Sequence, residues 1–158
     1  MNGSSKDKSI TKMGLIGAGR WGPNVIGAIN RLKDVELVRV ADPSDEAIKS
    51  LNIKFPFLKT TQEPQNIFED DEIHAVAICT PVETHSYLVR LALEHGKHVF
   101  VEKPFGNNVK QCEDLSRLAG KKDLTIVVGH VFLFNASILA LREIIESGKL
   151  GSVLHLEA

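Results

Sequence analysis

Short apolar runs alternate with helical patterns along most of this chain, and that alternation limits its fold more than any other feature. The clearest run is His74–Cys79, which is apolar at nearly every position, as expected of a central parallel strand buried on both faces. Parallel strands need long crossover connections, and each connection here has the length of a helix. The sequence therefore predicts an α/β fold: a doubly wound parallel sheet with helices on both faces.

The predicted strands and helices follow one another in turn. The strands expected are Met13–Ile16, Val35–Ala41, His74–Cys79, His98–Glu102 and Leu124–Gly129, with a short further strand within the ambiguous residues 55–61. The helices expected are residues 25–32, 44–51, 64–70, 84–95, 109–121 and 136–147. Ser44 and Thr84 are placed to cap the helices that they begin, because their side-chain oxygens can accept a backbone hydrogen bond.

The two ends of the chain differ from this central pattern. Residues 1–12 are rich in Ser, Lys, Asn and Gly, and we interpret them as a flexible tail before a doubly wound domain at residues 13–135. Residues 152–157 alternate like a half-exposed strand, but no partner strand follows them. We therefore expect residues 136–158 to be a connecting helix and the first strand of a second α/β domain that is cut short.

Composition and charge exclude several classes of protein. Of the 158 residues, 43% are hydrophobic and 25% charged, which is typical of a soluble globular protein. The net charge of −1 argues against a nucleic-acid binder, which would be basic. No apolar stretch approaches the about 20 residues that span a bilayer, and the first dozen residues contain no secretory signal. We expect a cytoplasmic protein without a membrane or nucleic-acid partner.

The cysteines and histidines give no sign of a disulfide framework or a metal site. Cys79 falls in a predicted strand and Cys112 in a predicted helix, and two scattered cysteines do not staple a chain of this size. The six histidines are dispersed, and none joins a cysteine at zinc-ligand spacing. We therefore expect no bound metal.

Residues 17–22 read GAGRWG and fit the pattern G-x-G-x-x-G between a predicted strand and a predicted helix. In such a loop Gly17 permits the tight turn, Gly19 lets the backbone approach a pyrophosphate, and Gly22 lets helix and strand pack closely. The N-terminus of the helix offers free N–H groups and a partial positive charge to the phosphates. The alternative is a glycine-rich turn that binds nothing.

Asp42 ends the second predicted strand, 20 residues after Gly22. An acid at this place hydrogen-bonds the adenosine ribose in dinucleotide-binding folds. Its negative charge would repel a 2′-phosphate, so the sequence favours NAD over NADP as cofactor. The alternative is an aspartate that only forms the turn before Pro43.

Two other predicted strands end in residues suited to chemistry. Ligands of open α/β sheets bind outside the carboxyl ends of the strands. One strand ends in Cys79-Thr80-Pro81, and another in Glu102-Lys103-Pro104. Glu102 and Lys103 are candidates for contacting a nicotinamide ribose and a substrate hydroxyl, and the alternative for Lys103 is an exposed surface lysine.

In combination these segments resemble the Gfo/Idh/MocA oxidoreductases, over nearly the whole chain after residue 12. The segments that carry the resemblance are GAGRWG at 17–22, Asp42, CTP at 79–81, THSYL at 84–88, EKP at 102–104, GHVFLFN at 129–135 and SGKLGSV at 147–153. Ala136 departs from the pattern, because proline usually follows the asparagine at this place. The family's catalytic Asp and His lie in a second domain, which this chain does not reach.

The resemblance implies a Rossmann domain followed by a domain with an open, mostly antiparallel sheet. It implies hydride transfer between a nicotinamide and a sugar, polyol or sugar-nucleotide carbon, with Lys103 assisting proton transfer and Glu102 contacting the nicotinamide ribose. The residues expected to bind the cofactor are Gly17, Gly19, Arg20, Trp21, Gly22, Asp42, Cys79, Thr80, Pro81, His85, Glu102 and Lys103.

The leading hypothesis is therefore the cofactor-binding part of an NAD-dependent dehydrogenase or reductase, incomplete for catalysis. Its substrate would be a small carbohydrate-type molecule, and the full-length form would be a homo-oligomer that pairs through the second domain. One alternative is a stand-alone NAD(H)-binding module or a non-catalytic subunit. Another is a structural or interaction domain that keeps the fold without the ligand, which the combination of GAGRWG and Asp42 disfavours.

Overall fold

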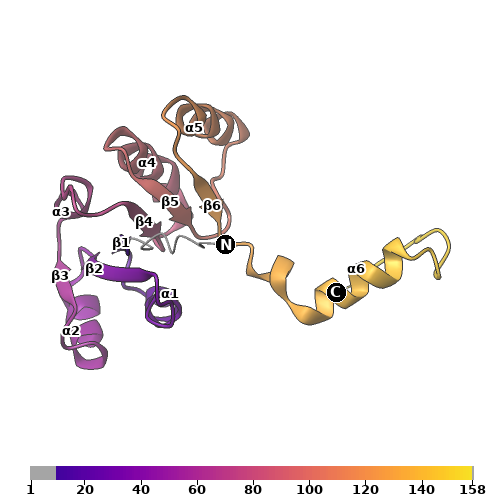
Figure 1. Ribbon diagram of the computed structural model, residues 1–158, viewed down its shortest axis with the longest axis horizontal. Coiled ribbons are helices and arrows are strands. Elements are labelled where there is room, and N and C mark those ends of the chain that lie inside the picture. The colour runs from indigo at the N-terminus through magenta and orange to yellow at the C-terminus, as the bar shows by residue number, and fades with distance from the viewer. Residues whose placement is uncertain (1–9, 158) are drawn as a thin grey trace, which may run out of the picture. The chain divides into compact units, whose positions relative to one another are not determined.

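The computed structural model of the chain describes residues 10–157, and Figure 1 shows their helices and strands. The chain divides into two compact units, residues 1–128 and residues 129–158. This division falls slightly earlier than the domain boundary expected after residue 135.

The first unit is built on a six-stranded parallel sheet. Its strands are β1 (Thr11–Ile16), β2 (Val35–Ala41), β3 (Lys59–Thr61), β4 (Ala75–Ile78), β5 (His98–Val101) and β6 (Ile126–Val128). Their order across the sheet is β3-β2-β1-β4-β5-β6, so the chain runs outward from β1 to one side and from β4 to the other. This is the strand order of the Rossmann fold, and the predicted doubly wound α/β class is confirmed.

Strand β1 begins earlier than the sequence suggested. Thr11 and Lys12, which were expected to belong to the tail of residues 1–12, are its first two residues. Thr11 pairs with Val35 of β2, so the pairing with β2 extends β1 beyond its apolar centre. Residues 1–9 of the expected tail lie outside the described residues.

Helices connect the successive strands and cover both faces of the sheet. They are α1 (Gly22–Ile29), α2 (Asp45–Lys54), α3 (Gln65–Phe68), α4 (Val82–Glu94) and α5 (Val109–Lys121). Adjacent strand residues point to opposite faces, and accordingly Leu15 belongs to one buried cluster and Ile16 to the other. Ile26 of α1 and Leu51 of α2 join the Leu15 cluster, whereas buried residues of α3, α4 and α5 join the Ile16 cluster.

The starts of two helices test the capping predictions. The Ser44 hydroxyl accepts a hydrogen bond from the Ala47 N–H at 3.2 Å, so the predicted cap of α2 is confirmed. The prediction that Thr84 caps the next long helix is wrong, because α4 already begins at Val82. Pro81, with a φ of −60°, sets the backbone for the helix, and the Thr84 hydroxyl instead donates back to the Pro81 carbonyl at 2.7 Å.

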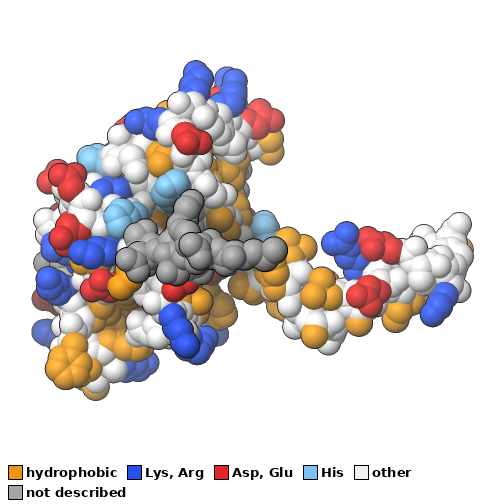
Figure 2. Space-filling view, viewed as in Figure 1, with side chains coloured by type: hydrophobic (Ala, Val, Ile, Leu, Met, Phe, Trp, Pro, Cys, Tyr) orange, Lys and Arg blue, Asp and Glu red, His pale blue; other side chains and the backbone are white. Residues whose placement is uncertain are grey.

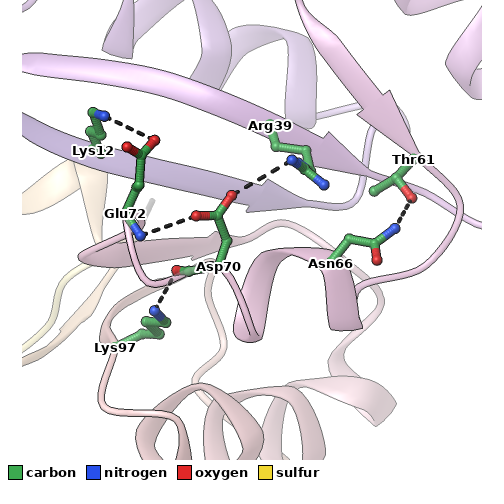
Figure 3. Close-up of polar contacts among 7 residues, drawn as sticks. All are labelled: Lys12, Arg39, Thr61, Asn66, Asp70, Glu72 and Lys97. Atoms are coloured by element: carbon green, nitrogen blue, oxygen red, sulfur yellow. Dashed lines mark hydrogen bonds and ion pairs between the residues drawn. The ribbon is translucent and has the colours of Figure 1, made fainter.

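Charged side chains surround the loop between α3 and β4. This amino-edge cluster consists of Lys12, Arg39, Asp70, Glu72 and Lys97 (Figure 3). Lys12 Nζ lies 3.0 Å from Glu72, whose hydrogen bond raises the pKa of Lys12, and Arg39 lies 3.6 Å from the Asp70 carboxylate. The buried Lys97 donates from Nζ to the Asp70 backbone carbonyl at 2.7 Å. These two ion pairs and the Lys97 hydrogen bond hold the loop before β4 in place.

The second unit contains a short 3₁₀ helix, Val131–Phe134, and the helix α6, Ala136–Glu146. Asn135 caps α6, because its side-chain oxygen accepts from the Ser137 N–H at 2.9 Å, and the usual proline at the helix start is not needed. The prediction of a strand at residues 152–157 is wrong for this structure. A strand is held by hydrogen bonds to a neighbour, and no described segment pairs with these residues.

Charged side chains of both signs are spread over the face in view. Figure 2 shows positive and negative side chains intermixed on both units, in keeping with the net charge of −1. Over residues 10–157, no helix combines the length and hydrophobicity that a membrane crossing requires. In the same residues, His, Cys, Asp and Glu side chains do not gather in threes or more where they could hold a metal ion.

Candidate functional site

A cleft of about 580 Å³ opens at the carboxyl ends of β1, β2 and β4. Its lining residues come from five segments: Ile16, Gly17 and Gly19; Ala41, Asp42 and Pro43; Gln62, Glu63 and Pro64; Cys79, Thr80 and Pro81; and Thr84, Tyr87 and Leu88. The cleft lies where β1 and β4 meet and the chain changes direction across the sheet, which is where open α/β sheets bind ligands. Its volume is in the range of small-molecule sites, about 300–1,000 Å³.

The three glycines of the loop have different physical reasons to be glycine. Gly17 has a φ of +102°, and a Cβ there would lie 2.7 Å from the backbone carbonyl of Cys79. A Cβ on Gly22 would lie 2.2 Å from the Gly17 carbonyl oxygen. A Cβ on Gly19 would meet no described atom within 4 Å. Gly17 and Gly22 are thus required by the protein's own packing, whereas the space beside Gly19 is open.

Asp42 is fixed beside the glycine loop. Its side chain is buried, with one carboxylate oxygen accepting from the Ala18 N–H at 2.7 Å and the other from the Ser44 N–H at 2.9 Å. Each oxygen has a second lone pair, so the carboxylate can still accept hydrogen bonds from a ligand. The loop and the acid, which the sequence analysis combined only by spacing, are therefore in direct contact.

Glu102 and Trp21 are brought together from distant parts of the chain. The Trp21 indole N–H donates to Glu102 Oε1 at 2.8 Å, and the Lys103 backbone N–H donates to Glu102 Oε2 at 3.2 Å. Glu102 is buried, whereas Lys103 is exposed. Glu102 and Lys103 are not among the residues that line the cleft, and no pattern in the sequence predicted the contact between Glu102 and Trp21.

Arg20 lines a smaller, shallow pocket of about 440 Å³ beside the cleft. This pocket also includes Gly19, Ser44 and Lys54. It shares Gly19 with the main cleft, so the glycine loop separates the two.

His85 is not among the residues that line this cleft. Its ring is 1% exposed and lies between two backbone carbonyl oxygens, with Nδ1 2.8 Å from Pro104 and Nε2 2.9 Å from Thr80. Its contacts are thus with the loops after β4 and β5.

Cys79 forms part of the cleft wall as a neutral thiol. Burial raises its pKa to about 12, and the negative charge of Glu102 adds to the shift. A thiol so hard to ionise is a poor nucleophile, so Cys79 contributes an apolar surface.

The structure adds lining residues that the sequence analysis did not include among those expected to bind the cofactor. Thr84, Tyr87 and Leu88 follow helical i, i+3, i+4 spacing on α4, so they share one helix face toward the cleft. That spacing could have identified Tyr87 and Leu88 once the helix was expected to border the site. Gln62, Glu63 and Pro64 come from the turn after β3, a strand that the sequence left ambiguous.

A larger and more open depression, about 740 Å³, lies between the loop after β5 and α5. Phe105, Asn108 and Cys112 are among the residues that line it. It includes none of the residues expected to bind a cofactor, and the site proposed below is the cleft at the glycine loop.

A comparison with protein families decides what kind of domain carries this cleft. The model of the GFO_IDH_MocA oxidoreductase family, described as an NAD-binding Rossmann fold, matches residues 11–130. The chain belongs to this family. The matched range contains the glycine loop, Asp42 and the segments at the ends of β4 and β5, so the resemblance predicted from those motifs is confirmed.

The chain is also similar to curated proteins and to solved structures. The chain is 28% identical over 140 residues to myo-inositol 2-dehydrogenase of Thermotoga maritima, and 30% identical over 142 residues to inositol 2-dehydrogenase of Rhizobium meliloti. These matches cover 89% and 90% of the chain, which spans 42% of the length of each relative. The structure of scyllo-inositol dehydrogenase from Lactobacillus casei, with bound NAD(H) and scyllo-inositol, superposes with a TM-score of 0.81 at 23% identity, over 91% of this chain and 43% of that one. That likeness shows the shared fold.

Proposed function

We propose that the chain binds NAD in the cleft and supplies the cofactor-binding part of a dehydrogenase or reductase. The observation that carries this proposal is the open space beside Gly19, on the same loop that holds the buried Asp42 carboxylate. Nothing among the described protein atoms requires Gly19 to be glycine, whereas a pyrophosphate approaching the backbone would require it. The substrate would be a sugar, polyol or sugar nucleotide, which the names of the inositol dehydrogenase relatives support.

The residues of the cleft fit the two halves of the cofactor. The N–H groups at the start of α1, together with the backbone at Gly19, would bind the pyrophosphate. Asp42 would accept hydrogen bonds from the adenosine ribose, and the apolar surfaces of Pro64 and Leu88 would border the adenine. Arg20 would lie on the outer side of the loop, toward the neighbouring pocket.

The other half of the cofactor would lie toward the ends of β4 and β5. Cys79, Thr80 and Pro81 line the cleft there, and Glu102, oriented by Trp21, would contact the nicotinamide ribose. The nicotinamide supplies the hydride acceptor or donor when the cofactor is bound. Lys103 would hold or move the proton of the substrate hydroxyl.

Asp42 would also set the preference for NAD over NADP. Its carboxylate is buried and held in place by two backbone N–H groups, so it cannot swing away from a bound ribose without losing both hydrogen bonds. A 2′-phosphate placed beside this fixed negative charge would be repelled.

The test compares two glycine-to-alanine substitutions by titration with NADH. Gly19→Ala should weaken NADH binding by about tenfold or more, because a methyl group on the loop blocks the close approach of the pyrophosphate. Gly27→Ala, in α1 and also without a close neighbour, is the matched control and should leave the affinity unchanged. Equal NADH affinity in Gly19→Ala and the unmodified chain would remove the glycine loop from the site.

A further inference from the structure

The backbone around Lys103 is held on both sides. On one side, the Glu102 N–H donates to the Ile78 carbonyl at 2.9 Å, and the Lys103 N–H donates to the Glu102 side chain. On the other side, the Pro104 carbonyl faces the ring of His85 at 2.8 Å. The segment that presents Lys103 is therefore attached both to β4 and to a side chain of α4.

The same histidine ring also contacts the loop after β4. Its second nitrogen lies 2.9 Å from the carbonyl oxygen of Thr80, a residue that lines the cleft. One side chain of α4 thus joins the cleft wall at Thr80 to the segment that carries Lys103. The ring is 1% exposed, so water does not compete for these contacts.

Two other histidines of the sheet are engaged in a different way. His74 and His98 lie at the amino ends of β4 and β5, away from the cleft. The Nδ1 of His74 accepts a hydrogen bond from the Lys12 N–H, and the Nδ1 of His98 accepts one from the Thr125 N–H, each at 3.1 Å. Both contacts of the His85 ring are instead with carbonyl oxygens, which can only accept. Whichever ring nitrogen carries the proton can therefore donate to one of the two loops, while the ring as a whole lies between both carbonyl groups.

We propose that His85 is a positioning residue that sets the separation of the Thr80 and Lys103 segments and so shapes the nicotinamide end of the cofactor cleft. The inference rests on the proposed function, in which NAD lies in the cleft with its adenosine at Asp42 and its nicotinamide toward Thr80 and Lys103. It assigns the ring a role without contact to the cofactor. Replacement of the ring should then lower the affinity for ligands that extend past the pyrophosphate to the nicotinamide, and should leave the affinity for shorter ligands unchanged.

The experiment titrates the 158-residue chain and its variants with NADH and, separately, with ADP, which contains only the adenosine and diphosphate half. His85→Leu removes the ring's N–H donor together with its polar contacts to both loops, and should weaken NADH binding by about tenfold while changing ADP binding less than about twofold. His85→Gln, which keeps an N–H donor and is the safer variant for folding, should recover part of the NADH affinity. His98→Leu, at the other edge of the sheet, is the matched control and should change neither affinity.

The outcomes separate this inference from the proposed function. If both His85 variants lower NADH and ADP affinity equally, the ring is merely structural and the inference is overturned. It is also overturned if NADH affinity stays the same in both variants. If the unmodified chain binds neither ligand, the proposed function itself fails.

Discussion

The carboxyl and amino edges of the sheet both hold charged side chains, but the two edges hold them in place with different partners. At the amino edge, Lys12 pairs with Glu72 and Arg39 with Asp70. At the carboxyl edge, Asp42 and Glu102 accept hydrogen bonds from backbone N–H groups and an indole, and neither forms an ion pair with another described residue.

This difference bears on which charges could still interact with a ligand. An ion pair within the protein uses the charge of both partners and leaves little for a ligand. A carboxylate held by N–H dipoles keeps its net charge and some of its lone pairs, while its position is fixed. If the carboxyl edge binds NAD as proposed, substitutions at the amino edge should change stability and substitutions at the carboxyl edge should change ligand affinity.

The substitution expected to have the largest effect is at Gly22, where the start of α1 packs against the backbone of the glycine loop. Gly22→Ala would place a methyl group 2.2 Å from the Gly17 carbonyl oxygen, so helix and loop would have to move apart. We expect a loss of about 3 kcal/mol in the free energy of unfolding, measured in urea, together with loss of NADH binding. Gly27→Ala, in the same helix, should instead gain up to about 1 kcal/mol. Equal stability of the Gly22→Ala and unmodified chains would contradict the packing role.

The next effect distinguishes the acids of the two edges. Asp42→Ala should weaken NADH binding by about tenfold to a hundredfold, because a hydrogen bond to a charged group contributes about 1.5–3 kcal/mol. It should also narrow the preference for NADH over NADPH. Asp70→Ala, at the amino edge, should leave both affinities unchanged in the same fluorescence titration. Unchanged selectivity in Asp42→Ala would rule out the ribose assignment.

A third substitution tests the amino edge by itself. Lys97→Met removes the ammonium group that donates to the Asp70 carbonyl in a buried place. The free energy of unfolding should fall by about 1 kcal/mol, because the Asp70 carbonyl loses one of its two donors and keeps the Ile73 N–H, while NADH affinity stays the same. A parallel loss of NADH affinity would show that the two edges are coupled, against the separation argued above.

The smallest effect concerns the orientation of Glu102. Trp21→Phe removes the indole N–H that donates to its carboxylate, and the backbone N–H of Lys103 remains. NADH affinity, measured by calorimetry, should fall by about fivefold, equivalent to about 1 kcal/mol. An unchanged affinity would mean that Trp21 does not orient Glu102 for the ligand.

Local pattern in the sequence predicted the sheet and much of the cleft. The apolar runs and crossover lengths gave the parallel order, and the strand-loop-helix context of GAGRWG placed Gly17 and Asp42 at the carboxyl edge. Ser44 could be identified as a cap because capping depends on neighbours within three residues. The strand at residues 152–157 was predicted wrongly, because alternation gives a residue pattern but not a pairing partner.

Contacts between distant segments could not be predicted in this way. Trp21 and Glu102 are 81 positions apart, and their hydrogen bond depends on the conformation of two loops. The resemblance implied that His85 binds the cofactor, but it gave no sign that the ring lies between carbonyl oxygens of two different loops, those of Thr80 and Pro104. The helix α4 begins at Val82, two residues before its predicted start at Thr84.

The most direct test of the central claim is calorimetric titration of the 158-residue chain with NADH and, in a separate experiment, with NADPH. We predict saturable binding of NADH at one site and clearly weaker binding of NADPH, because Asp42 holds a fixed negative charge beside the glycine loop. Binding of neither cofactor, or tighter binding of NADPH, would contradict the assignment of this cleft as an NAD site.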